Sequence, residues 1–133
     1  MCPENESETA IKSRYNILIA DDEVGIRYYL CKIVKGCGFC VETAEDGNQA
    51  LEKIKKIKFD ALVLDVTMPG ISGIQIYNWL KTGAATKNIP VIFCTAFTFE
   101  ELKAQIDGPD WYYLAKPFTG EDLCRKLYQI LGC

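Results

Sequence analysis

The chain has 133 residues, of which 49% are hydrophobic and 25% are charged, and its net charge is −3 at pH 7. These values are typical of a single globular domain, and the negative charge argues against a nucleic-acid-binding surface, which is normally basic. No apolar stretch approaches the ~20 residues of a membrane span, and the N-terminus lacks the basic and apolar regions of a signal peptide, so we expect a cytoplasmic protein with no membrane contact.

Residues 1–14 are polar and acidic, which predicts a flexible N-terminal tail before a single domain over 15–133. Within that domain, short apolar runs rich in β-branched and aromatic residues predict strands. Apolar residues at helical spacing, together with helix-capping residues, predict a helix after each strand. The expected strands cover 17–20, 39–43, 61–64, 89–94 and 111–115, and the expected helices lie near 26–37, 50–57, from 72 onward, 99–106 and 119–131.

Five strands that alternate with five helices predict a doubly wound α/β fold, in which helices cover both faces of a parallel sheet. Such sheets bind ligands at the carboxyl ends of their strands. Polar side chains stand at these ends: Asp21 and Asp22 after the first strand, Asp65 after the third, Thr95 after the fourth and Lys116 after the fifth. We therefore expect three carboxylates, a hydroxyl and an ammonium group to converge on one edge of the sheet.

Three carboxylates at such short range cannot all stay ionised unless a cation joins them. Mg²⁺ prefers oxygen ligands, binds few carboxylates and often shares its site with phosphate. One carboxylate could then act as a nucleophile towards phosphorus, while Lys116 supplies positive charge and Thr95 a hydrogen bond. The sequence thus indicates Mg²⁺-dependent phosphoryl transfer.

Histidine is absent, and the cysteines are seven, an odd number. Without histidine the chain cannot form a Ser-His-Asp or Cys-His catalytic site or a histidine metal site. Cys37 and Cys40 have the CxxC spacing of a zinc or redox site, but zinc needs two more ligands and no second CxxC is present. We therefore interpret the cysteines as small hydrophobic residues and expect no disulfide framework.

Several of these residues also have simpler interpretations when taken singly. Asp65 alone would be interpreted as a helix N-cap, and Thr95 alone as a β-branched strand residue. Tyr113 is explained as readily by packing within its strand as by a functional role. Only the combination of Asp65 with Asp21, Asp22 and Lys116 favours a functional site over these simpler interpretations.

Five stretches, in this order, resemble the receiver domain of two-component response regulators, of the chemotaxis-receiver kind. The resemblance implies a flavodoxin-like (βα)5 fold with a five-stranded parallel sheet of order 2-1-3-4-5 and helices on both faces. The stretches are ILIADDE, GFCVETAEDGNQALEKI, FDALVLDVTMPGISG, IPVIFCTAF and YYLAKPF, and together they span about residues 15–131.

The resemblance also assigns roles at the acidic edge of the sheet. Asp65 matches the phospho-acceptor. Asp21 and Asp22 match the acid pair that holds Mg²⁺ together with Asp65, and Thr67 matches the residue whose backbone carbonyl completes the metal site. Lys116 matches the lysine that pairs with the phosphoryl group.

Further matches concern the response to phosphorylation. Thr95 matches the switch hydroxyl, and Tyr113 matches the aromatic residue that moves inward on activation. The peptide bond before Pro117 is expected to be cis. Phe97 and Thr67 occupy positions that tend in this family to set the lifetime of the phosphoryl group.

The function implied by the resemblance is transfer of a phosphoryl group to Asp65 from the phosphohistidine of a sensor histidine kinase or a histidine phosphotransfer protein. The domain would be a signalling domain that catalyses only its own phosphorylation and dephosphorylation. Phosphorylation would change the surface formed by the fourth helix, fifth strand and fifth helix. A downstream protein, or an output domain outside this chain, would read that surface; a phosphorylation-dependent dimer, and membership in a larger regulator, are left open.

Three other functions are alternatives to this one. A phosphatase of the haloacid dehalogenase type needs Asp-x-Asp after its first strand, whereas position 23 is Glu, and the chain beyond Lys116 is too short for its second acidic motif. A flavodoxin-like FMN carrier needs a phosphate loop where this chain has Asp21 and Asp22. A degenerate receiver that only binds proteins would lack some of the required groups, all of which are present here.

Overall fold

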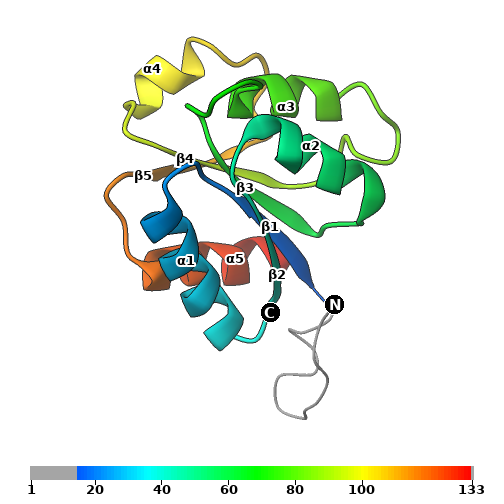
Figure 1. Cartoon of the computed structure of the whole chain (residues 1–133). Helices are drawn as coiled ribbons and strands as arrows, with labels where there is room; N and C mark the ends of the chain where they lie inside the picture. The colour runs from blue at the N-terminus through cyan, green and yellow to red at the C-terminus, as the bar shows by residue number, and fades with distance from the viewer. Residues whose placement is uncertain (1–14, 133) are drawn as a thin grey trace.

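The computed structural model of the chain describes residues 15–132 (Figure 1). Five parallel strands form one sheet in the order β2-β1-β3-β4-β5, which confirms the predicted fold and strand order. The expected tail at 1–14 lies outside the described residues. In chain order the elements are β1 (Asn16–Ala20), α1 (Val24–Gly36), β2 (Cys40–Ala44), α2 (Gly47–Lys56), β3 (Ala61–Asp65), α3 (Gly73–Leu80), β4 (Val91–Thr95), α4 (Phe99–Lys103), β5 (Tyr112–Ala115) and α5 (Gly120–Leu131).

The sheet has a hydrophobic core on each face. Helices α2, α3 and α4 lie on one face, and α1 and α5 lie on the other (Figure 1). In β1, Leu18 and Ala20 belong to the first core, whereas Ile17 and Ile19 belong to the second, because successive side chains of a strand point to opposite faces. Since both faces of the central strands are buried, polar side chains can reach solvent only at the strand ends.

Capping boxes fix where the last three helices begin. At α3, Ser72 accepts a hydrogen bond from the backbone of Gln75, whose side chain accepts one from the backbone of Ser72. Thr119 and Asp122 form the same arrangement at α5. A third box, at Thr98, opens α4. Each box satisfies N–H groups that would otherwise lack a partner at the start of the helix.

β4 and α4 differ from the ranges that the sequence pattern predicted. β4 begins at Val91 rather than at 89, because Pro90 has no N–H to donate to the sheet. α4 ends at Lys103 rather than at Ile106. The chain must then turn at Gly108, whose φ of 88° lies in the left-handed region that favours glycine.

The cysteines differ among themselves. Cys31, Cys37 and Cys94 are free thiols, and burial raises the pKa of Cys94. The Sγ atom of Cys124 donates to the carbonyl oxygen of Ile33 at 3.9 Å. Cys40, however, is disulfide-bonded, so the expectation that every cysteine acts as a small hydrophobic residue is wrong there. Cys40 is the first residue of the edge strand β2. No helix between residues 15 and 132 is long and apolar enough to cross a bilayer.

Candidate functional site

Asp65 is the last residue of β3 and is only 7% exposed. The backbone N–H of Thr67 donates to its Oδ1 atom at 3.3 Å. The chain folds back tightly beyond the strand, since a Cβ atom on Gly73 would lie 2.5 Å from the carbonyl oxygen of Asp65. The strand and the loop after it therefore hold the Asp65 carboxylate at the carboxyl end of the sheet.

Asp21 and Asp22 follow β1, which is the neighbour of β3 in the sheet. Asp21 is buried and accepts a hydrogen bond from the N–H of Glu23 at 2.9 Å, whereas Asp22 is exposed. One carboxylate oxygen from each of Asp21, Asp22 and Asp65 can be chosen so that all three lie within 4.8 Å of one another. Three carboxylate oxygens at this spacing fit a hard dication such as Mg²⁺.

Lys116 joins the carboxylates from the end of β5. Its Nζ atom donates to Asp21 Oδ2 at 3.1 Å and to Asp65 Oδ2 at 3.2 Å. The backbone N–H of Lys116 donates to the carbonyl oxygen of Thr95 at 2.8 Å, and the Lys116–Pro117 peptide bond is cis, as expected. One ammonium group beside three carboxylates leaves the cluster with excess negative charge.

The pKa shifts of Asp65 and Lys116 agree with this excess of negative charge. Burial raises the pKa of Asp65 above its ordinary value of 3.8; the charge of Lys116 partly offsets the rise, and the charge of Asp21 adds to it. Burial alone would lower the pKa of Lys116, but the charges of Asp65 and Asp21 and their hydrogen bonds outweigh it and raise that pKa above 10.5. The Asp65 carboxylate is thus strained in the absence of a further cation, as the sequence analysis predicted.

The stability of the metal-free protein should therefore depend on pH in a direction that is unusual for an aspartate. The protonated Asp65 side chain stabilises the folded state. This contribution to the free energy of unfolding is complete below the unfolded pKa of 3.8 and is lost as the pH rises through the raised folded pKa. In EDTA, the melting temperature of the wild type should rise relative to that of Asp65→Asn as the pH falls from about 7 to about 4. Asp21 and Asp22 are common to both proteins, so a difference that does not change with pH would contradict the raised pKa.

Thr95 and Tyr113 meet at one residue, Phe97. Thr95 is the last residue of β4 and is 3% exposed, and its Oγ1 atom accepts a hydrogen bond from the N–H of Phe97 at 3.0 Å. The hydroxyl of the half-buried Tyr113 donates to the carbonyl oxygen of Phe97 at 2.6 Å. The Thr95 hydroxyl therefore stands at the same sheet edge as Asp65 but is engaged with the loop after β4, and Tyr113 contacts that loop rather than the carboxylates.

Arg27 is a residue of this region that the sequence analysis missed. It lies in α1, and its Nη1 atom donates to the carbonyl oxygen of Asp21 at 2.7 Å. The signal in the sequence is weak, because a single basic residue in the first turns of an amphipathic helix is ordinarily a solvated one. Its contact with the loop that carries the acid pair becomes visible only in the structure.

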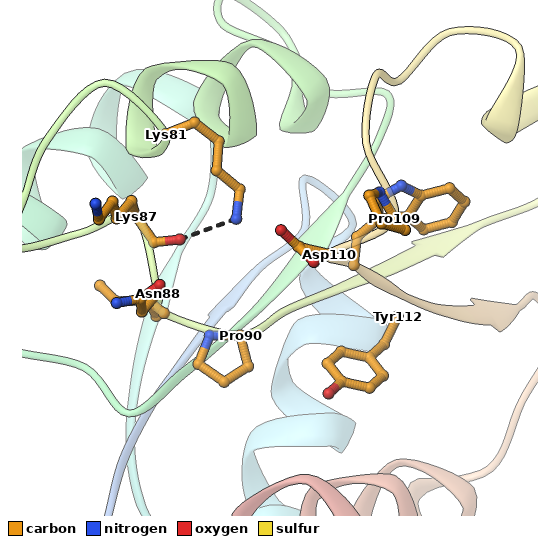
Figure 2. A pocket seen from close by; sticks show the side chains of 9 residues that line it. Lys81, Lys87, Asn88, Pro90, Pro109, Asp110 and Tyr112 are labelled. Carbon is orange, nitrogen blue, oxygen red and sulfur yellow. Dashed lines mark hydrogen bonds between the residues drawn. The ribbon is translucent and has the colours of Figure 1, made fainter.

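A pocket of about 370 Å³ lies at the opposite edge of the sheet from the carboxylates, where β4 and β5 begin (Figure 2). Its walls come from the segments before β4 and β5, where the Nζ atom of Lys81 donates to the carbonyl oxygen of Lys87 at 2.9 Å. None of the carboxylates of the cluster lines it, so it is separate from the candidate site. The lining residues are Lys81, Lys87, Asn88, Ile89, Pro90, Pro109, Asp110, Trp111 and Tyr112.

Comparison with known proteins agrees with the fold. The model of the response regulator receiver domain matches residues 17–128. The response regulator MprA of Mycobacterium ulcerans (strain Agy99) is 35% identical over 116 residues, which cover 86% of this chain and 49% of that protein. This chain thus spans about half the length of the curated relatives it matches.

Solved structures of response regulators also resemble this chain. The chemotaxis response regulator CheY4 of Vibrio cholerae superimposes with a TM-score of 0.80 at 31% identity, over 87% of this chain and 98% of that one. The response regulator TrrA of Thermotoga maritima, solved in complex with Mg²⁺-BeF, has a TM-score of 0.74 at 29% identity, with coverage of 87% and 98%. The phosphatase and flavodoxin alternatives are not favoured by these likenesses. The chain belongs to the response regulator receiver domain family.

Proposed function

We propose that the domain accepts a phosphoryl group on Asp65, in an Mg²⁺-dependent transfer from the phosphohistidine of a partner protein. The observation that carries the proposal is the convergence of three carboxylates and one ammonium group at the carboxyl end of the sheet. A protein partner or an output domain beyond this chain would then respond to the phosphorylated state. In this proposal the domain is a cytoplasmic phosphoprotein of two-component signalling.

The metal site is proposed to consist of the carboxylates of Asp21, Asp22 and Asp65 and the backbone carbonyl of Thr67. Support comes from the spacing of the three carboxylates and from the raised pKa of Asp65, since a cation would relieve their repulsion. Mg²⁺ would supply positive charge that stabilises the oxygens of the phosphoryl group in the transition state. The Mg²⁺-BeF complex of TrrA is consistent with such a site in this chain.

In the proposed reaction, a carboxylate oxygen of Asp65 attacks the phosphorus atom, and the P–N bond to the partner's imidazole breaks. The imidazole leaves with a proton taken from solvent, and an acyl phosphate remains on Asp65. Lys116, already 3.2 Å from Asp65, is placed to pair with the phosphoryl oxygens. The Thr95 hydroxyl accepts a hydrogen bond from the N–H of Phe97, so its own hydrogen remains available to be donated to the phosphoryl oxygens when it moves towards Asp65.

The partner that carries the phosphohistidine is proposed to contact the start of α1. Val24, Tyr28 and Tyr29 are large exposed residues there, directly after the acid pair. The Tyr29 hydroxyl accepts a hydrogen bond from the N–H of Gly120 at 3.2 Å, so this apolar surface continues to the start of α5. A partner seated on it would bring its imidazole close to Asp65. The surface of α4, β5 and α5 stays free for a downstream protein or a second copy of the chain.

Phosphorylation can be tested without knowledge of the partner. The wild type, incubated with acetyl phosphate and Mg²⁺, should gain one phosphoryl group in an intact-mass measurement, and borohydride reduction should locate it at Asp65. EDTA should prevent the gain. A label that persists in Asp65→Asn, or that maps to another residue, would contradict the proposed acceptor.

Binding of Mg²⁺ should stabilise the unphosphorylated protein by mass action. At ten times Kd the gain is about 1.4 kcal/mol, or roughly 5 °C in melting temperature for a domain of this size. Asp22→Asn should abolish this gain, because Asp22 offers the exposed carboxylate of the cluster. Glu23→Gln is the matched control, since Glu23 is an exposed acid next to the cluster but not part of it; an equal loss in both variants would argue for non-specific attraction.

A further inference from the structure

Arg27 reaches from α1 to the loop that carries the acid pair. Its backbone N–H donates to the carbonyl oxygen of Glu23 at 2.9 Å, which places Arg27 in the first full turn of the helix. Its side chain is only 16% exposed, and Nη1 donates to the carbonyl oxygen of Asp21 at 2.7 Å. A charged donor held against one backbone carbonyl in a mostly buried place fixes that peptide group.

The same guanidinium group also faces a second loop. Nη2 lies 4.0 Å from Oε1 of Glu45, which follows β2 and whose side chain is 61% exposed. An exposed ion pair at this distance contributes little by itself. The backbone N–H of Asp21 in turn donates to the carbonyl oxygen of Ala44 at 3.1 Å. The peptide groups on both sides of the Asp21 side chain are thus anchored, one by β2 and the other by Arg27.

We propose that Arg27 is a positioning residue for the metal site: it holds the main chain at Asp21 so that Asp21 and Asp22 keep their places when no cation is bound, and thereby raises the affinity for Mg²⁺. The inference rests on the proposed metal site and deepens it. The hydrogen bond between the Glu23 N–H and Asp21 Oδ1, at 2.9 Å, stabilises the same loop from the other side.

Arg27 can change the affinity for Mg²⁺ in two opposite directions, which a binding measurement can tell apart. As a cation near the site, Arg27 repels Mg²⁺, so its removal would strengthen metal binding. As an anchor, it keeps the loop ordered before the metal binds. Its removal would leave that ordering to be made during binding and would weaken the affinity for Mg²⁺. The repulsion is screened because Asp22 faces solvent, whereas the contact with the Asp21 carbonyl is short and mostly buried. Positioning should therefore dominate.

The test is an Mg²⁺ titration followed by amide NMR signals of Glu23 and Asp65 in the full chain. Arg27→Met and Arg27→Lys should both weaken Mg²⁺ binding by roughly tenfold, the lower end of the effect typical of groups that orient metal ligands. Lysine keeps the charge but lacks the guanidinium fork. Glu45→Gln is the matched control and should leave Kd within about twofold of the wild type, because its ion pair with Arg27 is long and exposed.

A tighter Kd in Arg27→Met, with a wild-type Kd in Arg27→Lys, would overturn the inference in favour of simple charge repulsion. A lower melting temperature with an unchanged Kd would reduce Arg27 to a structural role and would also overturn it. Hydrogen exchange of the Glu23 amide in EDTA gives a second readout, since it should become faster in both Arg27 variants if Arg27 orders the loop. If the wild type itself bound no Mg²⁺, the proposed function would fail whatever the exchange rates showed.

Discussion

Replacing Lys116 with methionine should lower the free energy of unfolding of the metal-free protein by roughly 2–3 kcal/mol. The ammonium group donates to Asp21 and Asp65, so its loss leaves two buried carboxylates side by side without a counter-charge. Methionine keeps most of the apolar stem and so isolates the effect of the charge. The Lys116 side chain is 22% exposed, which is why we expect less than the ~3–5 kcal/mol of a fully buried pair.

Urea denaturation in EDTA measures this effect, and Asp65→Asn serves as its counterpart. Because burial raises the pKa of Asp65, removing that charge should cost little stability or increase it. The double variant Lys116→Met/Asp65→Asn should then be more stable than Lys116→Met alone, by about 1 kcal/mol. Mg²⁺ should also stabilise Lys116→Met more than it stabilises the wild type. If Lys116→Met unfolded at the same urea concentration as the wild type, Lys116 would not be the group that neutralises the cluster.

The placement of the acidic cluster could be predicted because a single rule governs it. Strands buried on both faces have room for polar side chains only at their ends, and the carboxyl ends of parallel strands share one edge. Asp21 and Asp65 follow neighbouring strands in the observed sheet, and Lys116 follows β5 at the same edge. The order of residues along the chain was therefore enough to predict that Lys116 would meet Asp21 and Asp65.

Contacts made by backbone groups could not be predicted in this way. The bond from Arg27 to the Asp21 carbonyl depends on the direction of one long side chain, and no periodicity in the sequence encodes it. The state of Tyr113 was also unpredictable: the resemblance implies an inward movement on activation, yet its hydroxyl is already bonded to Phe97 in the unphosphorylated chain. The disulfide at Cys40 was missed because the sequence shows spacing, not which sulfur atoms meet.

These contacts offer a route by which the proposed phosphorylation of Asp65 would affect the opposite end of the sheet. Phe97 is bonded to Thr95 through its N–H and to Tyr113 through its carbonyl, so movement of the Thr95 hydroxyl towards a phosphoryl group would displace this peptide segment. The Tyr113 ring lies 5.6 Å from that of Phe99, which lies 5.4 Å from that of Trp111. Trp111 lines the pocket at the opposite edge. A shift at Phe97 would thus change the packing around an indole ring that is easily observed.

In a Trp79→Phe background, which leaves Trp111 as the single tryptophan, formation of the beryllofluoride complex should change the fluorescence of Trp111 and its indole NMR signal. Thr95→Ala should still accept a phosphoryl group at Asp65, yet lose most of that response, because no hydroxyl is left to move. Tyr113→Phe should also weaken it, since the ring stays but the hydrogen bond to Phe97 is lost. Tyr112→Phe, an exposed neighbour on the same strand, should respond like the wild type. A full response in Thr95→Ala would exclude this coupling while leaving the phospho-acceptor in place, because phosphorylation of Asp65 is measured separately by mass.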